Sequence, residues 1–332
     1  MKIIQTSFTC VVFGIFLLIV PALASAQVPG SWAYEWPKTD FSNHSVDLGE
    51  IISGGPPKDG IPSIDNPKFV PASSLGDADI GENEPVIGIS IKGKMRAYPL
   101  RILTWHEIVN DTFNGVPITV TYCPLCNSSI VFDRRLDGKL LDFGTTGKLR
   151  HSDMVMYDRQ TESWWQQFLG EGIAGELTGK RLKTLPSRLE SFANFKKRAP
   201  DGEVLVANNP GMRSYGANPY AGYDSASMPF LYQGDLPNYI NPMVRVVVAE
   251  GKAWALPLLA EKGTVTNGDL TLSWTAGQNS ALDQRSIRRS RDVGNVIVQR
   301  KGSDGTLSDV VYDVTFAFVY HAFYDGGRII TN

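Results

Sequence analysis

Alternating apolar and polar residues predict a series of short strands along much of this chain. Residues 85–98 (PVIGISIKGKMRAY) have this pattern, and Lys92-Gly93-Lys94 within them is typical of a hairpin turn. Residues 118–122 (ITVTY) alternate as a single strand. Two further strands, at 129–134 and 139–143, flank Asp137-Gly138, which is a second hairpin signal.

Helical patterning is scarce by comparison. Residues 100–109 (LRILTWHEIV) predict a short helix, because the preceding Pro99 is tolerated in a first helical turn. Residues 314–324 (VTFAFVYHAFY) predict another strand, with aromatic side chains on both faces. The 20 prolines and 32 glycines imply many turns. We therefore expect a mainly β fold of the α+β class, with short helices and long loops.

An internal repeat divides the chain. GKMRAYPL at 93–100 is echoed by GKAWALPL at 251–258, and ITVTYCPLCNSS at 118–129 by LTLSWTAGQNSA at 270–281. Matched blocks in the same order predict a duplicated β-rich unit. The expected organisation is an irregular arm (27–83), a first repeat with the C-x-x-C site (84–206), a Gly/Pro/Tyr loop (207–240) and a second repeat without cysteine (241–332).

The first 26 residues have the features of a cleavable signal peptide. Lys2 is followed by an apolar stretch at 11–20, and Ala24-Ser25-Ala26 forms a small-x-small cleavage site. Cleavage after Ala26 would leave a periplasmic or secreted protein. No later stretch has the length and hydropathy of a transmembrane helix, so we expect no membrane association after cleavage.

Charge and motifs exclude some function classes and leave others open. The 32 Lys and Arg residues balance 34 Asp and Glu residues, so nothing favours nucleic acid as a partner. The sequence has no nucleophile-elbow, P-loop, zinc-protease or dinucleotide motif. Whether the protein is an enzyme, what its partners are and how it oligomerises stay open at this point.

The chemistry is concentrated in one C-x-x-C motif, Cys123-Pro124-Leu125-Cys126, since Cys10 lies in the signal peptide. The second repeat has Thr275 and Gln278 at the corresponding positions, so the turn does not itself require cysteine. Three interpretations compete: a redox pair, a structural disulfide and a metal-binding turn. No βαβ pattern surrounds the motif, and a disulfide closing so small a loop removes little unfolded-state entropy.

The metal interpretation needs ligands beyond two thiolates. His106 on the predicted helix, His151 and Met154 are the candidates that we join to Cys123 and Cys126. Cysteine, histidine and methionine together form a soft donor set, which favours copper over zinc. We expect one copper or zinc ion at this turn.

The alternative is a module that binds no metal, in which the cysteines form a disulfide and aromatic loops hold a small ligand or a partner. A cysteine-thiolate enzyme is a third hypothesis. The Asp-Arg pairs could clamp a carboxylate, although most such pairs are local ion pairs, and the aromatic residues could stack on a ligand. The candidate ligand-binding residues are Asp133, Arg134, Asp158, Arg159, Trp164, Tyr220 and Tyr223.

Several segments together resemble DUF3179, a family of exported bacterial and archaeal proteins of unknown function. They are WHEIVND at 105–111, TYCPLCN at 121–127, FDR at 132–134, SDMVMYDR at 152–159 with WWQQ at 164–167, and NPYAGYD at 218–224. The resemblance covers most of the chain from about residue 60 onward. It implies where the site lies and how the protein is built, and it implies no particular chemistry.

Overall fold

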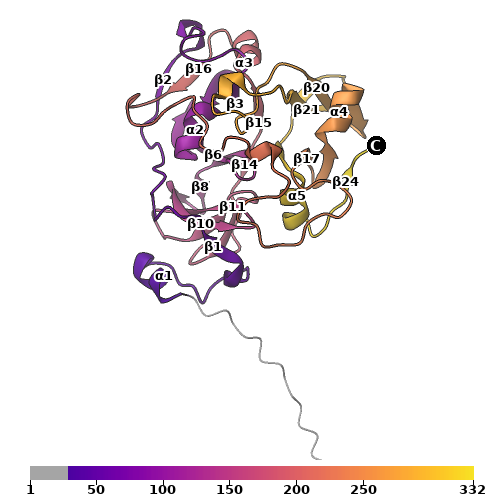
Figure 1. The fold of residues 1–332 in the computed structure, drawn as a ribbon. Coiled ribbons are helices and arrows are strands. Elements are labelled where there is room, and N and C mark those ends of the chain that lie inside the picture. Colours follow the sequence, from indigo (N-terminus) through magenta and orange to yellow (C-terminus); the bar gives the residue numbers. More distant parts are fainter. Residues whose placement is uncertain (1–28) are drawn as a thin grey trace, which may run out of the picture.

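The computed structural model describes residues 29–332. Five small sheets of four or five strands lie in a propeller-like arrangement, joined by short helices and long loops (Figure 1). This architecture confirms the mainly β prediction. The predicted signal peptide lies outside the described residues, and no helix within 29–332 is long and apolar enough to span a bilayer.

The predicted hairpin at 85–98 forms the centre of the first sheet. Its turn is made by Lys92 and Gly93, both with positive φ. The strand order is β15-β3-β4-β16-β2, in which β16 runs parallel to β4 and the other pairs are antiparallel. These strands are β2 (Lys68–Pro71), β3 (Pro85–Ile91), β4 (Lys94–Pro99), β15 (Ser187–Ser191) and β16 (Glu203–Val206).

A second sheet follows along the chain and carries the cysteine turn. The helix α2 (Leu100–His106) links β4 to it, and its order is β14-β7-β6-β5. The strands are β5 (Ile108–Phe113), β6 (Val116–Cys123), β7 (Ser128–Asp133) and β14 (Thr184–Leu185). The predicted helix over 100–109 is three residues too long, because Glu107 has φ 56° and turns the chain directly into β5.

The second half of the chain repeats this connectivity. One sheet has the order β23-β17-β18-β24, with β24 parallel to β18 just as β16 is parallel to β4. The other has the order β19-β20-β21-β22, and α4 (Leu256–Lys262) joins the two as α2 does. The strands are β17 (Arg245–Ala249), β18 (Lys252–Ala255), β19 (Thr264–Asn267), β20 (Leu270–Thr275), β21 (Asn295–Lys301), β22 (Leu307–Asp309), β23 (Tyr312–Phe316) and β24 (Ile329–Ile330).

The predicted strand at 314–324 is wrong beyond Phe316. The chain turns there into the helix α5 (Ala317–Phe323), whose first four residues are buried. Because apolar residues continue without a break, alternation in this segment could not distinguish a strand from a buried helix. The helix α3 (Phe192–Arg198) follows β15 in the first unit as α5 follows β23 in the second.

The fifth sheet has no counterpart in the second unit. Its order is β1-β10-β11-β12-β13, and it lies at the bottom of Figure 1 beside α1 (Gly30–Glu35). Trp32 and Trp36 of the predicted arm pack on Trp164 in a separate apolar cluster. The strands are β1 (Ile51–Ser53), β10 (Phe143–Arg150), β11 (Asp153–Asp158), β12 (Trp164–Gln166) and β13 (Glu171–Ala174).

Short elements complete the fold. A two-stranded ribbon is formed by β8 (Arg135–Leu136) and β9 (Lys139–Leu140) around the predicted Asp137-Gly138 turn. Four single 3₁₀ turns are η1 (Leu48–Glu50), η2 (Ala72–Ser74), η3 (Tyr223–Ser225) and η4 (Ile287–Arg289).

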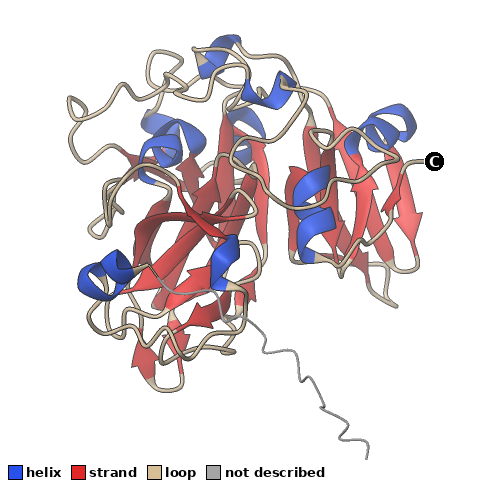
Figure 2. Ribbon diagram, turned by 60° about the horizontal axis from the view of Figure 1, so that its bottom comes forward, coloured by secondary structure: helices blue, strands red, loops and turns tan. Residues whose placement is uncertain are grey.

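The two units interlock, although Figure 2 shows the second as a distinct lobe. Thr315 of β23 donates a hydrogen bond to the Cys126 carbonyl (2.7 Å), and Asn127 donates one to Val314 (2.8 Å). In the reciprocal contact, the Ser191 amide donates to the Asn295 side chain (2.7 Å). Each unit therefore covers the turn of the other, and one apolar core extends through both.

Candidate metal centre and pocket

The cysteine turn is a compact knuckle between β6 and β7. The Cys126 amide donates to the Cys123 carbonyl (3.2 Å), and Asn127 closes the turn with φ 52°. Both thiols are free and buried. Cys123 pairs with Ser128 at the end of the hairpin, and both sulfurs lie close to Asp153 of β11.

Asp153 approaches the thiols from this fifth sheet. It is the first residue of β11, and two consecutive residues with positive φ, His151 and Ser152, precede it. The buried Asp153 carboxylate accepts hydrogen bonds through Oδ2 from Gln166 (2.5 Å) and from the Phe168 amide (2.9 Å). Its Oδ1 has no hydrogen-bond partner among the described residues other than the two thiols.

These three side chains form a group with the composition of a metal site. The two sulfurs and a carboxylate oxygen lie within 4.8 Å of one another, all buried. Thiolate and carboxylate are both established zinc ligands. In addition, the Cys123 thiol lies 3.6 Å from the Ser152 carbonyl, which ties the knuckle to the segment that presents Asp153.

Burial makes the anionic forms of this group unfavourable. It raises the pKa of both thiols and raises the pKa of Asp153 to about 6. The Asp153 charge adds to the rise at each cysteine. A bound cation would reverse these effects by stabilising all three anions at once.

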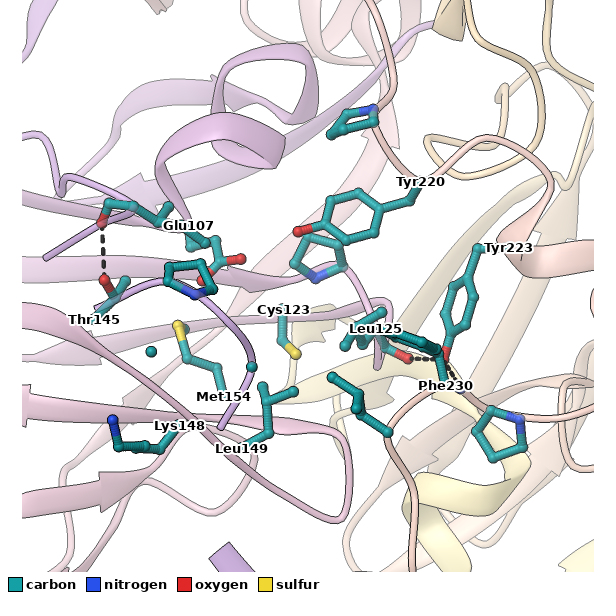
Figure 3. A pocket seen from close by; sticks show the side chains of 18 of the residues that line it. Glu107, Cys123, Leu125, Thr145, Lys148, Leu149, Met154, Tyr220, Tyr223 and Phe230 are labelled. Carbon is teal, nitrogen blue, oxygen red and sulfur yellow. Dashed lines mark hydrogen bonds between the residues drawn. The ribbon is translucent and has the colours of Figure 1, made fainter. Parts of the chain in front are cut away.

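A cavity of about 640 Å³ opens beside the knuckle (Figure 3). Cys123, Met154 and Glu107 lie along it, and Tyr220, Tyr223 and Phe230 come from the predicted Gly/Pro/Tyr loop. The Tyr223 hydroxyl donates to the Leu125 carbonyl (2.9 Å), so the loop is fastened to the knuckle itself. The cavity has the size of a small-molecule site.

Glu107 is the buried carboxyl group of this cavity, and its backbone is strained. It has φ 56° and ψ −31°, a conformation that side-chain-bearing residues rarely adopt. The corresponding residue of the second unit is Gly263, with φ 69° and ψ −42°. Equivalent amides, those of Tyr122 and Trp274, donate to the two carbonyls at 2.8 Å. The corner thus suits glycine, and the first unit carries glutamate there.

The chemistry of Glu107 is set by burial. Desolvation, reinforced by the Asp153 charge, raises the pKa of Glu107 to about 8, and a hydrogen bond from the Tyr220 side chain opposes the rise. Figure 3 shows the Tyr220 hydroxyl directed toward the Glu107 carboxyl group.

The two predicted histidine ligands bond elsewhere. Both ring nitrogens of His106 lie 2.8 Å from other partners, the Pro62 carbonyl and the Tyr215 hydroxyl. His151 Nε2 lies 3.4 Å from a Glu50 carboxylate oxygen. Among the described residues, the group of potential metal ligands is therefore Cys123, Cys126 and Asp153, without either histidine.

The other predicted site residues divide between the cavity and the rest of the molecule. Met154, Tyr220 and Tyr223 line the cavity. The residues of the Asp-Arg pairs bond to other partners: Asp133 to Arg135, Arg134 to Asp142, Asp158 to Thr161 and Trp165, and Arg159 to Asp65. Trp164 is buried in the cluster with Trp32 and Trp36.

The sequence argument missed Asp153 and Glu107. Asp153 stands between His151 and Met154, both of which it selected, but a single aspartate near a turn carries no signal of its own. Glu107 had no clear signal either, because only the equivalent ends of α2 and α4 in the structure place it opposite Gly263.

Comparison with known proteins assigns a family and no activity. The family model "Protein of unknown function (DUF3179)" matches residues 58–327. No curated protein and no solved structure matches the chain.

Proposed function

Because the chain belongs to the DUF3179 family, whose function is unknown, we propose its function from its own site: it binds one thiophilic metal ion through Cys123, Cys126 and Asp153. The observation that carries the proposal is the grouping itself: the two sulfurs and one Asp153 carboxylate oxygen are all buried and lie within 4.8 Å of one another. Three acidic groups so close together and out of water are costly to ionise unless a cation binds them.

The donor set favours zinc over copper. The sequence argument for copper relied on histidine and methionine, but His106 and His151 bond elsewhere. Two thiolates and a carboxylate oxygen suit Zn²⁺. Copper remains the alternative through Met154, whose thioether lies along the same cavity and would complete a softer set.

Export is part of the proposal, and it rests on the sequence of residues 1–26. In an oxidising compartment a bound ion would protect the two thiols from forming a disulfide. The intact mass of the exported protein should match a chain that begins at Gln27.

The test is metal content by mass spectrometry with a parallel count of free thiols, on protein purified from the exported fraction without chelator. We expect about one equivalent of zinc and two thiols that react only after the ion is removed. Cys123→Ser and Asp153→Asn should lose the ion, whereas His106→Gln should retain it. Protein with no metal and two free thiols would overturn the proposal.

The second candidate is a module that binds a small ligand without metal. The observation that favours it is the cavity lined by loop residues Tyr220, Tyr223 and Phe230. A protein with neither metal nor free thiols would support this candidate, because the cysteines would then be joined in a disulfide.

A further inference from the structure

The Glu107 carboxyl group has no ion-pair partner among the described residues. It is hydrogen-bonded to the Tyr220 side chain. Glu107 is only 8% exposed, and it occupies a backbone position that suits glycine. Strain and desolvation together are a cost that the fold avoids in its second copy.

Glu107 is the acidic residue and Lys148 the basic residue among the described residues that line the cavity. The Lys148 Nζ lies 3.4 Å from Glu35, which compensates its charge. A cation that binds there therefore meets a carboxyl group that it can ionise and no unpaired basic side chain.

The walls of the cavity are apolar and aromatic. Tyr220 and Tyr223 face the interior, while Met228 and Phe230 are 56% and 60% exposed at its rim. Aromatic faces attract organic cations, and most strongly where water is excluded. Aromatic walls of this kind contribute nothing to the binding of a metal ion by itself.

The loop that supplies these walls is anchored by the ion pairs of the buried Asp224 carboxylate. The Asp224 carboxylate, next to Tyr223 in sequence, lies 3.1 Å from Arg245 and 3.0 Å from Arg291. The Gly222 amide also donates to the Asp283 carbonyl (2.5 Å). The cavity is therefore largely preformed, which limits the ordering cost of binding.

We propose that this cavity binds a small organic ammonium compound with an apolar body, its cationic head paired with Glu107 and packed against Tyr220 and Tyr223. Binding would favour the ionised form of Glu107 by supplying the cation that the described residues do not provide. The inference does not depend on the metal site, so each can fail without the other.

The test compares two ligands of similar size and opposite charge, (2-phenylethyl)trimethylammonium and 3-phenylpropionate, by isothermal titration calorimetry. The quaternary ammonium group has no lone pair, so it cannot bind through a metal ion. We expect the cation to bind at least about tenfold more tightly than the anion, in metal-free and zinc-loaded protein alike. Glu107→Gln, which preserves the side-chain shape, should reduce this preference to about threefold or less.

Glu176→Gln is the matched control, because it removes one negative charge at an exposed site paired with Lys139. It should leave the preference unchanged. Equal or tighter binding of the anion, no binding of the cation, or a preference that survives Glu107→Gln would each overturn the proposal. If Glu107→Gln does not fold, the ratio of the two affinities in the wild-type protein still tests the proposal, because a preference for the cation below about tenfold would overturn it.

Discussion

Replacing Asp153 with asparagine should weaken metal binding and stabilise the metal-free protein. Asparagine can still accept hydrogen bonds from Gln166 and from the Phe168 amide through its carbonyl oxygen. It removes the buried charge and replaces one carboxylate oxygen with an amide nitrogen, which is a poor metal ligand. Loss of an outer partner of a metal ligand commonly costs 10–100-fold in affinity, so loss of a ligand should cost at least about 100-fold.

The gain in stability follows from the pKa of Asp153, which burial raises from 3.8 to about 6. The folded state then binds the proton more tightly than the unfolded state. Wild-type stability therefore falls as pH rises from about 4 through 6, and the full penalty applies above 6. At 1.36 kcal/mol per pKa unit, the penalty is about 3 kcal/mol at pH 7.5 and less than about 1 kcal/mol at pH 4. Asparagine carries no such penalty.

The assay is urea unfolding of metal-free wild-type and Asp153→Asn protein at both pH values, together with zinc affinity from competition with a chromophoric chelator. The exposed Asp137, paired with Lys180, provides the control Asp137→Asn, which should change neither quantity appreciably. If Asp153→Asn lowers the unfolding free energy at pH 7.5 and leaves zinc affinity within about threefold, the carboxylate is structural and the reasoning is wrong.

Three further substitutions test other parts of the structure. Glu107→Gly should raise the unfolding free energy by about 1 kcal/mol in urea titrations, because glycine adopts the positive φ without strain, as Gly263 does. Glu107→Ala should raise it less. An equal increase for both variants would show that backbone strain is not the cause. Burial raises the pKa of Asp313 from 3.8 to about 7, so wild-type stability falls as pH rises through this range. Asp313→Asn should make the metal-free protein less pH-dependent by about 2–3 kcal/mol between pH 5 and 8, and an unchanged profile would refute this. Asp224→Ala removes the ion-pair partner of the buried Arg245 and should lower the unfolding free energy by about 3–5 kcal/mol. Relative to the wild-type protein, hydrogen exchange should accelerate more in residues 218–231 than in residues 85–99. An equal acceleration in both segments would show that Asp224 does not hold the loop.

Hairpins could be predicted because their signals are local, and the repeat because two distant segments share the same residues in the same order. The turn at Lys92 and Gly93 and the alternation around it specify β3 and β4 without reference to the rest of the chain. The helix boundary at Glu107 could not be predicted, because its strained conformation depends on the corner between α2 and β5. The strand predicted after Phe316 was wrong for a related reason. A continuously apolar run is compatible with a strand or with a buried helix, and packing decides between them.

The sequence by itself determined the mainly β architecture and the turn that presents Cys123 and Cys126, since alternation and turn residues are local signals. It also indicated the duplication, because matched residues recur in the same order. Only the tertiary structure decided which side chains share the site. Asp153 reaches the sulfurs because β10 and β11 belong to a sheet inserted into the first unit. His106 is nearer to Cys123 in sequence but bonds to Pro62 and Tyr215. Proximity in a folded protein follows from how sheets pack, and a carboxylate on one sheet has no sequence pattern that links it to a turn on another.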